Sequence, residues 1–206
     1  MKFITDIQYF PTTILYKNSF PCTNIIFEQY EHYQKMSFRN RMMIAGSNGI
    51  IKLTVPLEDG RDQKKLMRDI KIANKEKWQK QHWRTIISCY NHSPWFEHYR
   101  DELEILYHRP FDFLLDWNLS CFEWTVKKLE WPVIISLTDS FQKSYDDMEM
   151  IDRRNNILPK NYLNFEPLTY RQVFEERIGF LPNLSILDLF CCEGKNAKNL
   201  LLKNHY

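Results

Sequence analysis

Short apolar runs separated by polar loops fill the first third of the chain. Runs rich in Ile, Val and Phe are typical of β-strands, and Asn48-Gly49 is a turn signal directly before one of them. We therefore expect a sheet to be built mainly from this part of the chain. The predicted strands cover residues 3–9, 24–28, 50–56 and 70–72.

The apolar spacing changes to a helical period from about Lys75 onward. Trp78, His82 and Ile86 recur at every fourth position and so share one face, and the pattern ends before Pro94. Further elements follow in the rest of the chain. They are helices over about 94–107 and 115–129, a strand over 133–137, an ordered loop or short helix over 146–164, and a helical tail over 174–202 that breaks around Gly179 and Pro182.

This order of elements predicts the fold class. Strands come first and helices later, which is typical of an α/β or α+β protein. We expect an α/β fold whose mixed, largely parallel sheet is built from the N-terminal third and residues 133–137 and is covered by helices. A chain of 206 residues is most often one domain, so residues 1–206 are predicted to form a single unit.

Composition and charge exclude several classes of function. The 28 basic and 26 acidic residues nearly balance, which argues against a nucleic-acid surface. No apolar run approaches the roughly 18 residues of a membrane span, so stable membrane insertion is not expected. The five cysteines form no CxxC pair and suit a reducing compartment, so we expect a cytoplasmic protein without disulfides. No recognised metal-ligand spacing or cofactor motif occurs, and neither a metal nor a cofactor is predicted.

His82 is the most informative single residue, because its spacing places the imidazole inside the apolar helix face. Two interpretations stay open. The ring is either a buried neutral imidazole bonded to a carboxylate or a backbone carbonyl, or a general base or acid whose pKa its surroundings hold near the working pH. The groups that lie opposite the ring decide between these two.

Polar residues that follow the first two strands are the natural partners of His82. If those strands are parallel, Asp6 and the residues after it share one edge of the sheet with the segment 28–41. Arginine offers forked donors for phosphate or carboxylate, although an Arg–Glu network that only pins the loop is the alternative. The candidate site residues are His82, Glu28 and Glu31 as catalytic groups and Gln8, Tyr9, Tyr30, Arg39, Asn40, Arg41 and Trp83 as substrate-binding groups.

A series of short motifs runs in order along almost the whole chain. They are Ile-Gln-Tyr-Phe-Pro at 7–11, Glu-Gln-Tyr-Glu-His-Tyr at 28–33, Phe-Arg-Asn-Arg at 38–41, Asn48-Gly49, Leu-Thr-Val-Pro at 53–56, Asp69-Ile70, Trp78-x-x-x-His82-Trp83 and Ser-Pro-Trp-Phe at 93–96. This series resembles the WbqC-like family of bacterial proteins, and the tail at 174–194 resembles the ending of its shorter Bacteroidetes-type members. The chain departs from many members at 12–16, where Thr-Thr-Ile-Leu-Tyr replaces an aromatic-glycine turn.

The resemblance implies a function in bacterial surface polysaccharide biosynthesis, since members are associated with O-antigen and capsule gene clusters. It implies a transferase that moves an aminoacyl, glycyl or acyl group to an amino sugar, with a nucleotide-linked or lipid-linked sugar as substrate. In this hypothesis Arg39 and Arg41 hold an anionic part of the donor, and His82 takes the proton from the attacking amine. Tyr9, Tyr30 and Trp83 supply stacking walls. The alternative is a non-catalytic ligand- or partner-binding protein of the same pathway, and assembly into a homo-oligomer is left open.

Overall fold

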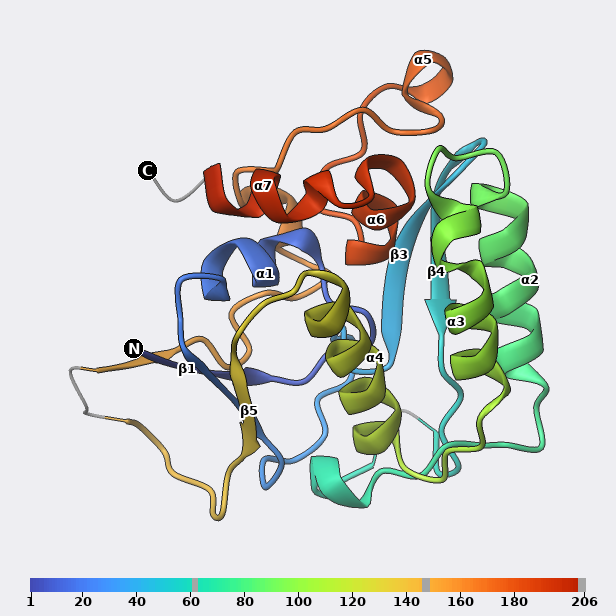
Figure 1. Ribbon diagram of the computed structural model, residues 1–206. Helices are drawn as coiled ribbons and strands as arrows, with labels where there is room; N and C mark the ends of the chain where they lie inside the picture. Colours follow the sequence, from blue (N-terminus) through green and yellow to red (C-terminus); the bar gives the residue numbers. More distant parts are fainter. Residues whose placement is uncertain (61–62, 146–148, 204–206) are drawn as a thin grey trace.

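A four-stranded parallel sheet and a separate β-hairpin organise the computed structural model, which describes residues 1–60, 63–145 and 149–203 (Figure 1). The parallel sheet has the strand order β5-β2-β1-β6. Its strands are β1 (Lys2–Asp6), β2 (Asn24–Glu28), β5 (Ile134–Leu137) and β6 (Met150–Asp152). All three neighbouring pairs are parallel, so the condition that the sequence left open for the first two strands is met.

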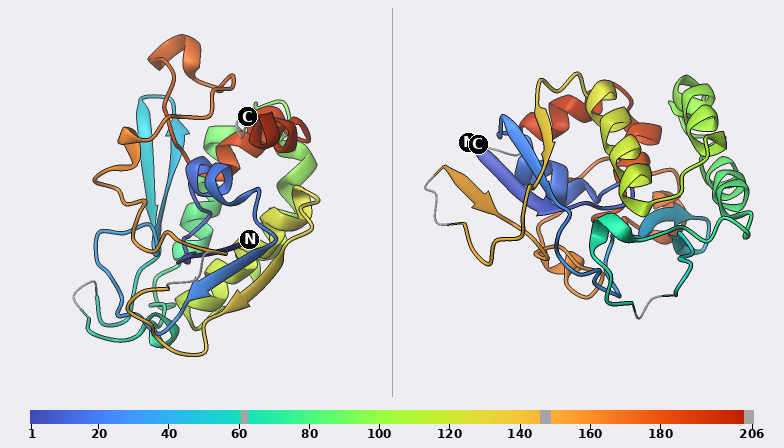
Figure 2. Two further views of the ribbon diagram at one scale, coloured as in Figure 1. Left: turned by 90° about the vertical axis from the view of Figure 1, so that its left-hand side faces the viewer. Right: turned by 90° about the horizontal axis from the view of Figure 1, so that it is seen from below.

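The hairpin consists of β3 (Arg41–Gly46) and β4 (Gly49–Thr54), joined through Ser47-Asn48. Gly49 has φ +124°, a backbone conformation that favours glycine, so the turn signal in the sequence has a physical basis. Figures 1 and 2 show the hairpin set apart from the four-stranded sheet. The fold is therefore mixed α/β with a mostly parallel main sheet, as predicted.

Helices connect the strands and cover them. α2 and α3 lie side by side next to the hairpin, and α6 contacts α1, α3 and β3 (Figure 1). None of the helices in the described ranges is long and apolar enough to cross a membrane. The helices are α1 (Thr13–Ser19), α2 (Trp78–Tyr90), α3 (Phe96–His108), α4 (Leu114–Lys128), α5 (Glu175–Ile178), α6 (Ile186–Glu193) and α7 (Asn196–Lys203), with 3₁₀ turns η1 (Met67–Asp69) and η2 (Tyr162–Asn164).

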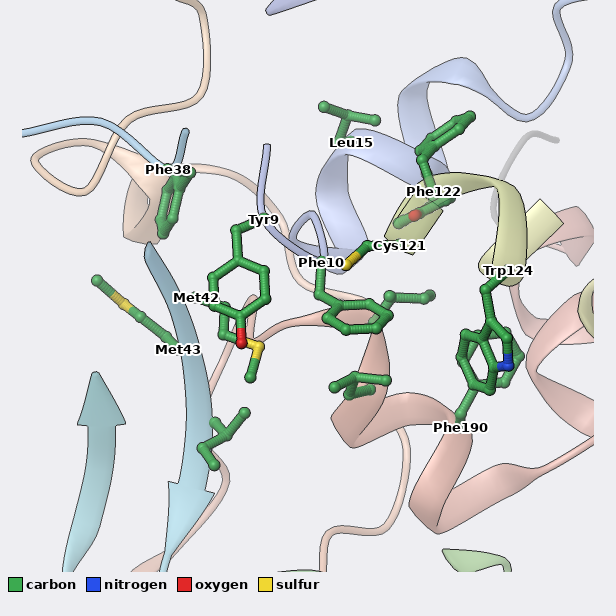
Figure 3. Close-up of a cluster of buried hydrophobic side chains, with 14 of the residues drawn as sticks. Tyr9, Phe10, Leu15, Phe38, Met42, Met43, Cys121, Phe122, Trp124 and Phe190 are labelled. Carbon is green, nitrogen blue, oxygen red and sulfur yellow. The ribbon is translucent and has the colours of Figure 1, made fainter. Parts of the chain in front are cut away.

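Aromatic side chains fill the space between these elements. Figure 3 shows Phe10 between the methionines of β3 on one side and Trp124 and Phe190 on the other. The Phe10 ring meets Trp124 edge-on at 6.0 Å between ring centroids, and Trp124 meets Phe190 at 5.5 Å. Such edge-to-face pairs add to the stabilisation from burial itself. The core thus joins the chain's beginning to α4 and α6.

Several predicted elements differ from the observed ones. The first strand ends at Asp6 rather than at Tyr9, because the Tyr9 amide leaves the sheet and donates to the Phe38 carbonyl at 3.0 Å. Residues 70–72 form no strand, because Lys71 and Ile72 make only isolated bridges. Two strands, β3 and β6, the helix α1 and the 3₁₀ turn η1 were not predicted in the described ranges, and the helical tail contains α5, α6 and α7 rather than two pieces. Part of the predicted loop at 146–164, residues 146–148, lies outside the described residues.

The path of the chain through the sheet defines a switch point. The chain passes from β1 to β2 and on to β5 in one direction, and then returns to the other side of β1 to form β6. The order of the strands along the chain therefore reverses between the neighbouring strands β1 and β6. In open parallel sheets, ligands bind in the crevice outside the carboxyl ends of the strands at such a point.

Candidate functional site

Acidic residues stand at the carboxyl ends of three of the four parallel strands. Asp6 ends β1, Glu28 ends β2 and Asp152 ends β6, while Thr138 follows β5 directly. Because the strands are parallel, these residues share one edge of the sheet. Asp6 and Glu28 are completely buried. Buried carboxylates need partners, and two arginines supply them.

Arg39 neutralises the first part of this edge. Its guanidinium is fully buried, and Nη2 donates to Glu31 and, at 2.8 Å, to the Asn155 side-chain oxygen. Its Nη1 lies 3.7 Å from Asp6, and the Asn155 amide nitrogen donates to the second Glu31 oxygen at 3.0 Å. Burial would lower the pKa of Arg39, but Asp6 and Glu31 outweigh this and raise it. Arg39 is therefore a permanent positive charge sealed beneath the surface.

Arg154 neutralises the second part of this edge of the sheet. It donates to both oxygens of Asp152, at 3.0 Å and 2.6 Å, and to Glu28 at 3.2 Å. Its remaining hydrogens go to the carbonyls of Gln142 at 2.8 Å and Lys143 at 3.4 Å. Burial raises the pKa of Asp152, but the hydrogen bonds from Arg154 outweigh that and leave the pKa below its ordinary value. Asp152 is thus held as a carboxylate.

A pocket of about 900 Å³ opens above these two networks. Glu31, Asp152, Arg154 and Asn155 lie in its wall, so it sits outside the carboxyl ends of β1 and β6, at the switch point. The Phe141 side chain is 54% exposed, which leaves much of its ring open to a ligand. The pocket is lined by Tyr30, Glu31, His32, Tyr33, Gln34, Phe141, Lys143, Asp152, Arg154 and Asn155.

His82 lies elsewhere, in the aromatic core. Its Nδ1 is 3.0 Å from the Tyr9 hydroxyl, which is 2.7 Å from the Tyr107 hydroxyl. The Trp78 ring meets the imidazole edge-on, with 5.2 Å between the ring centroids. Burial lowers the pKa of His82 to about 4, and a hydrogen bond with the Thr54 backbone offsets this only in part. The inward orientation was predicted correctly. Among the described residues, however, its hydrogen bonds and ring contacts include no residue of the segment 28–41.

The structure brings together only some of the predicted site residues. Tyr30 and Glu31 line the pocket, and Glu28 lies behind it through Arg154. Arg39 is sealed beneath the pocket, so the predicted contact between its guanidinium and an anionic part of the donor is replaced by the Arg–Glu network that was the alternative. Gln8 donates to Asp6 at 3.1 Å and supports the same network. The others lie away from the pocket lining, namely Tyr9 and Trp83 in the core against Tyr107, Asn40 bonded to the Val55 carbonyl, and Arg41 at the start of β3.

Of the ten residues that line the pocket, sequence reasoning named only Tyr30 and Glu31 as site residues. Asp152, Arg154 and Asn155 come from β6 and the turn after it, and they pair with residues well over a hundred positions earlier. The available signal was the charged and polar run 152–155 directly after the apolar pair Met150-Ile151, which is the pattern of a strand with polar residues at its carboxyl end. In the described part of the chain, no group of three or more His, Cys, Asp and Glu side chains could hold a metal ion.

Comparison with known proteins gives one match. Residues 7–160 match the family model described as the WbqC-like protein family. All residues that line the pocket fall inside this range, whereas α5, α6 and α7 fall outside it. No curated protein and no solved structure matches the chain.

Proposed function

The chain belongs to the WbqC-like protein family, and from this premise we propose that it is a transferase of bacterial surface polysaccharide biosynthesis that acylates or aminoacylates an amino sugar held in the pocket. The observation that carries the proposal is the pocket at the switch point, with carboxylates and aromatic rings in its wall. Such crevices are where open parallel sheets bind their ligands.

The hydrogen-bonding groups in the pocket wall favour a ligand that donates hydrogen bonds. An arginine has five N–H donors, and Arg154 directs all five at protein oxygens. A carboxylate has about four acceptor sites, and Glu31 uses two of them, one for Arg39 and one for Asn155. Glu31 therefore retains room to accept from an amine or a sugar hydroxyl, whereas Arg154 has no donor left for a phosphate.

The charge of this edge favours a positive group on the ligand. The four carboxylates of Asp6, Glu28, Glu31 and Asp152 face the two guanidinium groups of Arg39 and Arg154. Among the described residues of these networks, two negative charges stay uncompensated, in surroundings where burial weakens solvent screening. Lys143 also lines the pocket, but its side chain is exposed and water screens its charge. A protonated amino sugar supplies the missing positive charge.

The rings in the wall suit a sugar. Tyr30, Tyr33 and Phe141 present apolar faces beside polar groups, the combination by which pockets hold and orient small polar ligands. The Arg68 guanidinium lies over the Tyr30 ring at 5.1 Å and donates to its hydroxyl at 3.0 Å, which fixes that ring in place. Before the transfer step the bound ammonium group releases one proton to water, and the neutral sugar nitrogen then forms the new C–N bond to the donor's carbonyl carbon. The bond from that carbon to the donor's leaving group breaks, and the nitrogen loses a proton.

Calorimetric titration tests the proposal. Glucosamine should bind and glucose should bind at least tenfold more weakly, since only glucosamine carries the amine. Phe141→Ala should weaken glucosamine binding by three- to tenfold without harming the fold, because its ring is largely exposed. Leu163→Ala is the matched control, because Leu163 is 56% exposed and lies outside the pocket lining. Equal binding of the two sugars, or an equal effect of the two variants, would contradict the proposal.

Binding without catalysis is the second candidate, and one observation favours it. Both carboxylates in the pocket wall are already engaged by arginines, as in a site that only holds its ligand. Mass spectrometry of glucosamine incubated with the protein and an acetyl or glycyl thioester separates the two functions. Appearance of the N-acylated sugar supports the transferase, and binding without any product supports the binding protein.

A further inference from the structure

His32 lies in the pocket wall with one ring nitrogen fixed by the backbone. Its Nδ1 is 2.9 Å from the Lys64 carbonyl oxygen. A carbonyl oxygen only accepts hydrogen bonds, so Nδ1 must carry the hydrogen and donate it. The neutral ring then has its lone pair on Nε2, and no described residue forms a hydrogen bond with that nitrogen. His32 thus offers the pocket a free proton acceptor.

The backbone around His32 holds the ring in position. His32 and Leu66 form an isolated antiparallel bridge. On one side of it the Tyr33 amide donates to the Lys65 carbonyl at 2.9 Å, and on the other the Met67 amide donates to the Glu31 carbonyl at 2.9 Å. These bonds tie both neighbours of His32 to the segment that carries Lys64. A catalytic base needs such fixed geometry more than it needs burial.

We propose that His32 is the catalytic base of the pocket and that its Nε2 accepts the proton lost by the attacking amine. The inference rests on the proposed function and identifies the group that accepts the proton released in that transfer step. The amine nitrogen bonds to the donor's carbonyl carbon, the carbonyl releases its leaving group, and the proton passes from nitrogen to Nε2. The imidazolium then returns this proton to the leaving group, so His32 ends the cycle neutral.

His108 is a built-in control for this arrangement. Its Nδ1 is also bonded to a backbone carbonyl, that of Glu104 at 2.7 Å, and its side chain is also exposed. It lies at the end of α3 and is absent from the pocket lining. The two histidines therefore share one tautomer, are both exposed and differ in position.

Ring-nitrogen NMR and transfer rates test the inference together. Among the six histidines, spectra of His32→Gln and His108→Gln assign the two rings. Both neutral rings should carry the hydrogen on Nδ1, and glucosamine should shift only the Nε2 signal of His32. In the thioester assay, His32→Gln should lower the transfer rate by about 10²- to 10⁴-fold with glucosamine affinity unchanged, while His108→Gln leaves both unchanged.

The outcomes separate this inference from the proposed function. A wild-type protein that transfers the acyl group, with a His32→Gln rate within twofold of it, overturns the role of His32 and leaves the transferase standing. A neutral His32 that carries its hydrogen on Nε2 also overturns the role. A wild-type protein that neither binds glucosamine nor acylates it refutes the proposed function, and with it the base that the function requires.

Discussion

Acidification should weaken the fold through His82, because its imidazole is packed among aromatic rings and stays neutral in the native state. Burial lowers the pKa of this ring from 6.5 to about 4. Below about pH 6.5 the unfolded chain binds a proton that the native chain does not bind until about pH 4. Stability is therefore lost as the pH falls through this window. At about 1.36 kcal/mol for each pKa unit, the full effect is about 3 kcal/mol.

Urea denaturation at a series of pH values measures this effect. The free energy of unfolding of His82→Gln should fall less between pH 7 and pH 4 than that of the wild type, by about 3 kcal/mol. Taking the difference between the two proteins removes the contributions of the other ionisable groups. His92→Gln, which replaces an exposed imidazole, serves as the control. Parallel pH profiles for wild type and His82→Gln would refute the assignment of His82 to a dry interior.

Three other substitutions or treatments test the packing. Arg39→Met should lower the free energy of unfolding by about 3–5 kcal/mol, because it leaves buried carboxylates without their cation. Arg68→Met removes an exposed ion pair and should lower it by at most about 1 kcal/mol. Equal losses for the two variants would contradict the buried network. In thermal denaturation, Gly194→Ala should destabilise the protein by at least about 2 kcal/mol more than Gly179→Ala. Both glycines have positive φ, but only the new Cβ at position 194 would meet the Trp95 ring, at 2.1 Å. All five cysteines are buried, and burial raises the pKa of each thiol. The native protein should therefore react slowly with a thiol reagent such as DTNB and take up five equivalents only when it is unfolded. Rapid labelling of the native protein would contradict this.

Local patterns predicted the longer elements of the fold. The three helices α2, α3 and α4 each run 13 to 15 residues, long enough for a helical period to be read from the sequence. β6 has three residues, and among the described residues its only strand partner is β1, at the far end of the chain. A run this short has no period of its own, because its pairing with a distant strand determines its conformation.

The candidate site was likewise predictable only where a local sequence pattern marks it. Glu28 and Glu31 follow a strand that local pattern identifies, so the edge of the sheet on which they lie could be inferred. The Arg39 guanidinium is held in its buried position partly by Asn155, and Glu28 is paired with Arg154. Both partners lie more than a hundred residues later in the chain. The inward orientation of His82 follows from helical spacing, and so does its contact with Trp78 on the same helix, but the Tyr9 ring that packs against it comes from the beginning of the chain.

The structure of the protein with glucosamine bound tests the central claim most directly. The account predicts the sugar in the pocket at the carboxyl ends of β1 and β6, with its amine within hydrogen-bond distance of the Glu31 carboxylate and of Nε2 of His32. The sugar found at another surface, or in this pocket with its amine turned to solvent, would contradict it.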